Sequence, residues 1–378
     1  MEQNVRSLTA SLEGLQRTAF AAADLARRAH AQALAAFGLG PKERPYRVAV
    51  SGGHWRLRDY GGKPGASPFL IVAAPIKRPY IWDLAPSASA VARLLHEGFH
   101  VYLIEWTEPA GGGQALGLDE HCEAISQCAA MIARAAPGNR PYLAGHSLGG
   151  TLAALFAAAE PANIRGLVLL GAPLCFEPGA SKFRDALVAL LPLEVSETDP
   201  FPGSLLSCMA AMADPGTFIW SRMMDAAQSA SDLRALQMHA LVERWSLDEA
   251  ALPGKLVGEI LQWLFRENRF CRGALHVRGR EASPSRLALP TLAVVNTADE
   301  IAPLASIKPC LDAMPAGAAR IIEYQGETGV VLQHLGVLIG RQAHARVWPE
   351  IVAWLNGNSA ARAEQHHQTE RYHVARAR

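Results

Sequence analysis

Residues 142–159 read YLAGHSLGGTLAALFAAA, and this stretch carries the clearest structural signal in the chain. The apolar residues 142–144 predict a short buried strand, and residues 148–159 predict a helix directly behind it. Between them stands the pattern G-x-S-x-G, with its serine at Ser147. A strand that turns at once into a helix holds this serine in strained backbone angles, and the flanking glycines admit close neighbours. The pattern therefore predicts a nucleophilic Ser147 above one edge of a sheet, with a glycine-rich turn without catalysis as the alternative.

The helix that follows the serine predicts an oxyanion site beside it. Its unpaired N-terminal amides and its dipole favour negative charge, so the N–H of Leu148 is the first expected donor. The second donor is expected in the loop after the predicted strand at residues 69–73, which contains Ile76 and Lys77. We assign this role to Ile76, with Lys77 as the alternative. The side chains of Lys77 and Arg78 are interpreted as solvated loop charges.

A serine nucleophile needs a base and an orienting acid, and behind a motif of this kind they follow in the order Ser, Asp, His. Asp299 lies in a polar loop just after the predicted strand at residues 292–296. His334 lies in a loop after the last predicted strand, residues 320–324. Because both loops are expected at the same edge of the sheet, His334 is predicted to take the Ser147 proton while Asp299 orients its ring.

The sequence contains other residues that could serve as the acid or the base. Glu300 adjoins Asp299 and is the alternative acid. His344 is interpreted as a surface residue of a helix. His146 is interpreted as a packing or substrate-contact residue rather than as the base.

Short apolar strands alternate with helices before Pro173 and again after Pro290, which indicates a mostly parallel sheet covered by helices. More than a hundred mainly helical residues separate the two parts and predict a lid over the site. Together with the serine motif, this order predicts an α/β-hydrolase fold with a helical lid insertion. The predicted parts are an amphipathic helix at residues 1–40, a core at 41–173 and 286–357, a lid at 174–285 and a flexible tail at 358–378.

Small or apolar residues recur at alternating spacings of four and three between Leu8 and Ala33, which is typical of an amphipathic helix. Gly38, Gly40 and Pro41 are expected to end this helix. We expect it to pack on its own chain, with a contact to a second copy or to a partner subunit as the alternative.

The composition excludes several classes of function. Among 378 residues, 36 Lys and Arg balance 35 Asp and Glu, so the charge excess typical of nucleic-acid-binding proteins is missing. The six cysteines lack a C-x-x-C pair and are expected to be reduced and mostly buried, and we expect neither a metal nor a cofactor. The apolar runs are too short to span a membrane, and the N-terminus lacks the pattern of a secretory signal. The expectation is a cytoplasmic enzyme that acts on small neutral or apolar substrates.

Several segments taken together resemble the polyhydroxyalkanoate synthases, enzymes that polymerise 3-hydroxyacyl-CoA thioesters. These segments are PIKRPYIWDL at 75–84, LLHEGFHVYLIEW at 94–106, ERW at 243–245, PG at 253–254, ENR at 267–269, the stretch 273–279, DEIAP at 299–303 and HLGV at 334–337. The resemblance extends from about Trp55 to Leu355. It implies that Asp299 and His334 are the acid and the base of the site.

Two departures from the synthase pattern bear on the reaction. The family places cysteine where this chain has Ser147, and histidine is expected where Glu300 stands. A thiolate exchanges acyl groups readily with CoA thioesters, whereas a serine ester is the usual intermediate of hydrolysis. The expected function is therefore hydrolysis of an ester or thioester of a hydrophobic, 3-hydroxyacyl group through an acyl-serine intermediate. Polymerisation of 3-hydroxyacyl-CoA and a non-catalytic role on polyester granules are the alternatives.

Overall fold

The computed structural model describes residues 2–108, 115–190 and 195–358, with side chains from Thr18 onward. Within these ranges, the main sheet has eight strands in the order β1-β2-β6-β3-β7-β8-β13-β14. From β6 to β14 the neighbouring strands are parallel, whereas β1 and β2 add an antiparallel edge. Apart from its first residue, the predicted flexible tail at 358–378 lies outside the described residues.

The strands of this sheet are β1 (Arg47–Ser51), β2 (Trp55–Gly61), β3 (Pro68–Val72), β6 (His100–Trp106), β7 (Tyr142–His146), β8 (Gly166–Leu170), β13 (Thr291–Asn296) and β14 (Ala319–Tyr324). Every residue of β3, β7, β8 and β13 is buried. Continuous apolar runs of this kind suit parallel strands that have helices on both faces. Short two-stranded pairs are β4 (Asp83–Ala85) with β5 (Ala88–Ser89), β9 (Pro200–Phe201) with β10 (Leu252–Pro253), and β11 (Leu275–Val277) with β12 (Arg280–Ala282).

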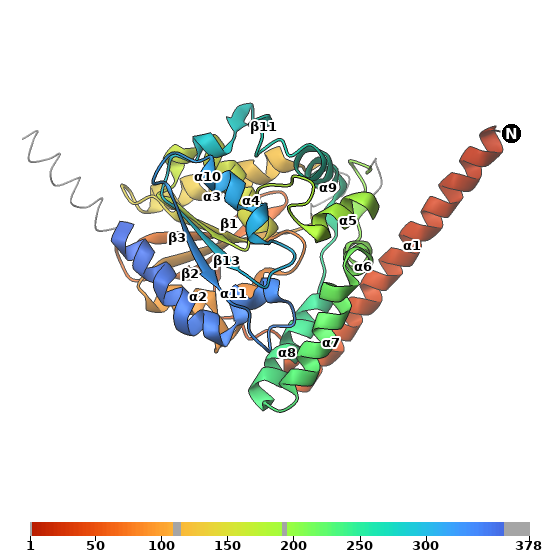
Figure 1. Cartoon of the computed structure of the whole chain (residues 1–378), viewed down its shortest axis with the longest axis horizontal. Coiled ribbons are helices and arrows are strands. Elements are labelled where there is room, and N and C mark those ends of the chain that lie inside the picture. Colours follow the sequence, from red (N-terminus) through yellow and green to blue (C-terminus); the bar gives the residue numbers. More distant parts are fainter. Residues whose placement is uncertain (1, 109–114, 191–194, 359–378) are drawn as a thin grey trace, which may run out of the picture.

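Helices cover both faces of the sheet (Figure 1). On one face, α3 (Leu118–Ala135), α4 (Leu148–Ala159) and α10 (Lys308–Asp312) belong to one hydrophobic core. On the other face, α2 (Ala90–His96), α11 (Gly336–Ile339) and the helical segment from η9 (Ala343–Val347) to residue 358 belong to a second core. Further short helical turns include η2 (Pro79–Trp82), η4 (Gly216–Trp220), η5 (Ile260–Arg266), η7 (Leu304–Ser306) and η8 (Gln333–Leu335). This arrangement is the predicted α/β-hydrolase fold.

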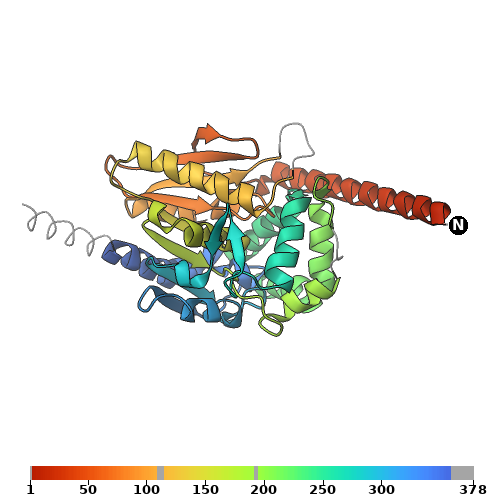
Figure 2. The same ribbon diagram turned by 90° about the horizontal axis from the view of Figure 1, so that it is seen from above.

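Between β8 and β13 the chain leaves the sheet and forms a cap of helices. They are α5 (Lys182–Leu190), α6 (Gly203–Ala213), α7 (Ser221–Ser229), α8 (Leu233–Leu247) and α9 (Gly254–Glu259). In Figures 1 and 2 they form a group to one side of the sheet. The β11–β12 hairpin, which follows them in the chain, packs instead against α3 and α4. The last part of the segment predicted as a lid therefore lies on the core, and the exact division into domains stays a prediction.

The N-terminal helix α1 (Glu2–Leu34) lies along α6 and α8 of the cap, and its first half extends away from the rest of the molecule (Figures 1 and 2). Asp24 accepts a hydrogen bond of 2.7 Å from the Ser204 N–H, and Arg27 donates one of 3.1 Å to Glu249. The second half of α1 thus packs on its own chain, while a partner contact of the projecting half stays a prediction. None of the helices that the structure describes combines the length and the apolar character needed to cross a membrane.

Candidate active site

Ser147 occupies a sharp turn between β7 and α4. Its backbone has φ 54° and ψ −133°, a region that non-glycine residues rarely adopt and that stores strain. The turn is closely packed, because a Cβ added to Gly149 would lie only 2.3 Å from the Val72 carbonyl oxygen. The Ser147 N–H donates to the Leu170 carbonyl at 3.1 Å, which ties the turn to the end of β8. The turn therefore has the backbone geometry and the close packing that the G-x-S-x-G pattern leads us to expect.

Asp299 and His334 form a buried pair near this turn. The His334 Nδ1 lies 2.7 Å from Asp299 Oδ2, and both side chains are almost entirely removed from solvent. The other carboxylate oxygen, Oδ1, accepts hydrogen bonds from the backbone N–H groups of Ile301 at 2.9 Å and Ala302 at 3.1 Å. Burial alone would raise the pKa of Asp299, but His334 and these two amides outweigh it, so the pKa lies below its ordinary value. Asp299 is therefore an anion that fixes the orientation of the imidazole.

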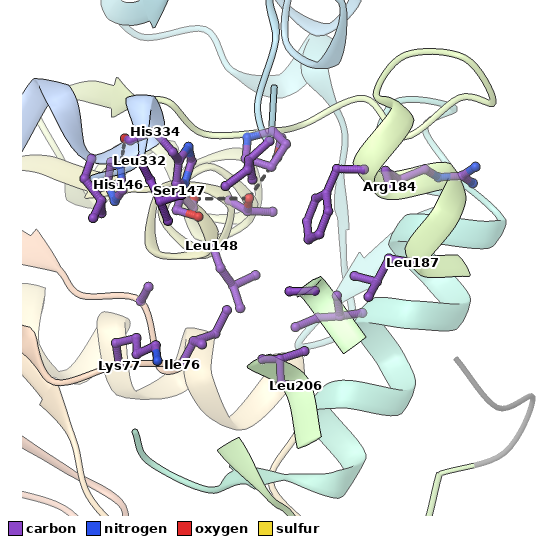
Figure 3. A pocket seen from close by; sticks show the side chains of 18 of the residues that line it. Ile76, Lys77, His146, Ser147, Leu148, Arg184, Leu187, Leu206, Leu332 and His334 are labelled. Atoms are coloured by element: carbon purple, nitrogen blue, oxygen red, sulfur yellow. Dashed lines mark hydrogen bonds between the residues drawn. The ribbon is translucent and has the colours of Figure 1, made fainter. Parts of the chain in front are cut away.

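The second ring nitrogen of His334, Nε2, is buried. Among the described residues, no hydrogen bond reaches this buried Nε2. Because Nδ1 donates its proton to the Asp299 carboxylate, Nε2 of the neutral ring carries a lone pair. His334 and Ser147 line the same cavity and lie beside one another in Figure 3. The structure thus brings Ser147, Asp299 and His334 together, with an unoccupied proton acceptor facing the serine's cavity.

The cavity has a volume of about 280 Å³ and a predominantly apolar wall. The core supplies Leu148 and Ile76, which Figure 3 shows below Ser147. Much of the remaining wall comes from apolar side chains of the cap and the loops next to it: Phe176, Phe183, Leu187, Leu206, Phe218, Val257, Ile260, Leu261 and Phe265. A site of this composition suits the apolar part of an acyl group, and the cap determines how long a group fits.

The interpretation of Lys77 as a solvated loop charge is wrong. Its Nζ lies 2.5 Å from Glu249 Oε1 and 2.5 Å from the Ser246 carbonyl oxygen, and burial lowers its pKa to about 8. The backbone of Lys77 also forms an isolated antiparallel bridge with Glu249. Such a bridge at Lys77 does not use the N–H of Ile76. The bridge thus leaves the Ile76 N–H available, and the role of Ile76 as the second oxyanion donor stays a prediction.

Glu300, the alternative acid, faces the cap rather than the base. Its Oε2 accepts a hydrogen bond of 2.5 Å from the hydroxyl group of Thr217, whereas Asp299 contacts His334. His344 is not a surface residue as expected, because it is partly buried and its Nε2 lies 2.7 Å from the Leu338 carbonyl oxygen. Neither Glu300 nor His344 lines the cavity of Ser147.

His146 supports the loop that carries the base. Its Nε2–H donates to the backbone carbonyl of His334 at 2.8 Å, and the two rings lie 4.6 Å apart. Burial lowers the pKa of His146 to about 3, so the ring is neutral at ordinary pH. A ring whose protonation is this unfavourable is a poor general base at neutral pH, which agrees with a packing role.

Two buried histidines lead us to expect that the free energy of unfolding depends on pH. Burial lowers the pKa of His121 to about 4 and that of His146 to about 3, whereas both titrate near 6.5 in the unfolded chain. The unfolded state therefore binds more protons below pH 6.5, and the free energy of unfolding is expected to fall as the pH decreases, by about 2 kcal/mol per histidine at pH 5. Urea denaturation at pH 7 and pH 5 measures this loss. The His121→Gln variant should lose less stability than wild type over this interval, whereas replacing the exposed His96 should change nothing; equal losses in all three proteins would contradict the prediction.

In the part of the chain that the structure describes, the cysteines and the potential metal ligands form no further centre. All six cysteines are free, and four of them, Cys122, Cys128, Cys175 and Cys310, are buried. Within the described ranges, no group of three or more histidine, cysteine or carboxylate side chains is arranged to hold a metal ion.

Sequence comparison places the chain among known proteins. A family model described as serine aminopeptidase, S33, matches residues 85–200. The poly(3-hydroxyalkanoate) polymerase subunit PhaC of Haloferax mediterranei is 28% identical over 317 residues, which cover 82% of this chain and 63% of the relative. The PhaC subunit of Synechocystis sp. is 24% identical over 330 residues, which cover 84% of this chain and 85% of the relative. The chain is therefore similar in sequence to polyhydroxyalkanoate polymerases, and its fold is that of an α/β-hydrolase.

Solved structures agree with this fold. The chain superimposes on the monoacylglycerol lipase of Paleococcus ferrophilus with a TM-score of 0.50 and 18% identity, covering 80% of this chain and 99% of the lipase. A hydrolase from Pseudomonas aeruginosa gives a TM-score of 0.50 and 16% identity, covering 82% and 97%. The chain spans a little under two thirds of the PhaC subunits of Haloferax mediterranei and Haloarcula marismortui, at 63% and 62% of their lengths.

Proposed function

We propose that this synthase-like α/β-hydrolase is a serine-dependent acyl-transfer enzyme that hydrolyses an ester or thioester of a hydrophobic, 3-hydroxyacyl group. The observation that carries the proposal is the buried His334–Asp299 pair: His334 lines the same apolar cavity as the strained Ser147, and its Nε2 has no hydrogen-bond partner among the described residues. The fold and the relatives support an enzyme of the hydrolase or acyltransferase type. The 3-hydroxyacyl group is inferred from those relatives, which are poly(3-hydroxyalkanoate) polymerase subunits.

In the proposed mechanism, the Ser147 hydroxyl attacks the acyl carbonyl while His334 Nε2 takes its proton. The imidazolium that forms is stabilised by the Asp299 anion at 2.7 Å. His334 then returns the proton to the departing alcohol or thiol, which leaves an acyl-serine. A water molecule, deprotonated by the same Nε2, attacks this ester; His334 then gives that proton to the Ser147 oxygen as the acyl–oxygen bond breaks and the acid is released. Each step uses groups that belong to this chain.

The N–H groups of Leu148 and Ile76 are expected to stabilise, by hydrogen bonds, the negative charge that develops on the carbonyl oxygen. Leu148 is the first residue of α4, so its amide has no partner within the helix and the helix dipole favours an anion there. One donor of this kind typically contributes about 3 kcal/mol to lowering the barrier. Because both donors are backbone groups, their contribution depends on the loop conformation rather than on a particular side chain.

Polymerisation of 3-hydroxyacyl-CoA is the second candidate, and it is favoured by the similarity to poly(3-hydroxyalkanoate) polymerase subunits. In that reaction the acyl group on Ser147 passes to the hydroxyl end of another 3-hydroxyacyl unit instead of to water. The presence of serine, where the synthase family is expected to have cysteine, favours hydrolysis because a serine ester exchanges less readily with thiols than a thioester does. The two reactions share the acylation step and differ only in the acceptor.

Incubation with 3-hydroxybutyryl-CoA separates the two reactions. Hydrolysis predicts one free 3-hydroxybutyrate per CoA released, measured by a thiol assay and by chromatography of the acid. CoA release together with an insoluble polyester and little free acid would establish polymerisation and overturn the hydrolytic proposal. The Ser147→Ala variant serves as the control for non-enzymatic CoA release.

A further inference from the structure

A buried carboxylate in the cap holds the loop that carries the base. Asp225 lies on α7, 104 residues before Gly329 of the loop that it contacts, and is almost completely buried. Its Oδ1 accepts a hydrogen bond of 2.7 Å from the Gly329 N–H, and its Oδ2 accepts one of 3.1 Å from the Val331 N–H. The Nδ1 of His239, on α8, lies 2.8 Å from the same Oδ2. Three donors therefore converge on two oxygens, and two of them belong to the segment directly before His334.

That segment has a backbone conformation that does not form readily on its own. Val331 has a φ of 63° and Gly329 a φ of 84°. A β-branched residue in the left-handed region is a strained outlier, which persists only where surrounding contacts hold it. Asp225 provides such contacts at both positions. The loop is also close to α8, because a Cβ added to Gly329 would lie 3.3 Å from the Ala235 Cβ.

Side-chain packing between the loop and α7 is incomplete. A cavity of about 480 Å³ separates them, with Ser221, Met224 and Gln228 of α7 on one side and loop residues from Gly326 to His334 on the other. Asp225 itself belongs to this wall. These hydrogen bonds add a restraint from the cap to a loop that the core also holds, because Val330 and Val331 are buried in the second core and Gln333 donates to the Glu327 carbonyl at 2.9 Å. At the far end, Asn296 of β13 donates to the Gln333 carbonyl at 2.8 Å, so the core holds the residue next to His334.

We propose that Asp225, oriented by His239, is a positioning residue through which the cap sets the place of the base His334. The core fixes His334 from Asn296 and Asp299, and the cap fixes the strained residues that lead into it. A cap that shifts away from the core would release Gly329 and Val331 and displace Nε2 from Ser147. The position of the cap and the competence of the base are thereby coupled. This inference rests on the proposed role of His334 as the general base.

The Asp225→Asn variant tests the coupling with little change in volume. An amide group keeps one acceptor oxygen and presents an NH₂ group to the other donors, so at least one of the two loop amides loses its partner. We expect kcat for a 3-hydroxybutyryl ester to fall about 10- to 100-fold with KM nearly unchanged, because a small displacement of a reacting group is costly. The matched control is Asp232→Asn in the same cap. Asp232 is exposed, accepts hydrogen bonds from the backbone N–H groups of Arg234 and Ala235 at the start of α8, and pairs with Arg341 at 3.3 Å; in the described part of the chain it has no hydrogen bond to residues 327–334.

Amide hydrogen exchange provides a readout that does not depend on turnover. In the full-length protein, Asp225→Asn should accelerate exchange in the peptide that covers residues 327–334 by about tenfold or more, whereas Asp232→Asn should leave it unchanged. Unchanged exchange in both variants would overturn the proposal. If wild type hydrolyses no ester or thioester, the proposed function fails, while the exchange measurement still decides whether Asp225 holds the loop.

A double variant separates positioning from general stability. If Asp225 acts only through His334, adding Asp225→Asn to His334→Ala should leave the residual turnover within about twofold, because the positioned group is already absent. A residue that merely stabilises the fold would lower the residual activity in both backgrounds by the same factor. Equal factors in the two backgrounds, or a loss with Asp232→Asn as large as with Asp225→Asn, would contradict the inference.

Discussion

The Ser147→Ala variant is expected to lose about 10⁶-fold in kcat for a 3-hydroxybutyryl ester and for its CoA thioester. The substitution removes the oxygen that forms the covalent bond, while the oxyanion amides, His334 and the cavity remain. Alanine keeps the Cβ, so it tolerates the backbone φ of 54° as well as serine does, and the fold should persist. Steady-state turnover together with circular dichroism measures both halves of this expectation.

A fluorophosphonate probe checks the same prediction without knowledge of the substrate. The probe should label wild type at Ser147 and leave Ser147→Ala unlabelled, as shown by intact-protein and peptide mass spectrometry. Ser231→Ala, which removes an exposed serine of the cap, is the matched control and should be labelled like wild type. A wild-type protein that is neither labelled nor active would favour the non-catalytic alternative, a binding role on a polyester surface.

The sequence predicts the elements around Ser147 well because their signals are local. An apolar strand, a glycine-flanked serine and a helix follow one another within 18 residues, so no distant contact is needed to recognise them. Asp299 is predictable for a related reason, because it stands just after β13, at the carboxyl end of that strand. The sequence does not predict the edge strand β1 (Arg47–Ser51), because its residues are exposed or only partly buried and form no apolar run.

Contacts between distant segments could not be predicted from the sequence. Lys77 and Glu249 are 172 residues apart, and only the folded chain shows that they form a buried ion pair. Asp225 and Gly329 are 104 residues apart, and an aspartate on an amphipathic cap helix is ordinarily solvated. Such pairs depend on how the cap sits against the core, which periodicity along the chain does not encode. The glycine at 329 and the strained Val331 became informative only once their φ angles were known.

Replacing Asp299 by asparagine should lower kcat by about 10⁴-fold although the shape of the site hardly changes. The two backbone amides at Oδ1 are donors, so the asparagine must turn its carbonyl oxygen toward Ile301 and Ala302. Its NH₂ group then faces His334 Nδ1, which has to become an acceptor. The ring proton moves to Nε2, the nitrogen that faces the cavity of Ser147. A protonated Nε2 in a neutral ring cannot take the serine proton, so the base is lost through its tautomer rather than through its position.

The Glu300→Gln variant is the matched control. It makes the same change from carboxylate to amide at the neighbouring residue, which is the alternative acid in the sequence. Glu300 contacts Thr217 of the cap and not His334, so the rate should remain within about threefold of wild type. Fluorophosphonate labelling of Asp299→Asn should slow in parallel with turnover, because both reactions require the same proton transfer. A large loss in Glu300→Gln together with a small loss in Asp299→Asn would reverse the assignment, and the hydrogen bond between Asp299 and His334 would then be structural only.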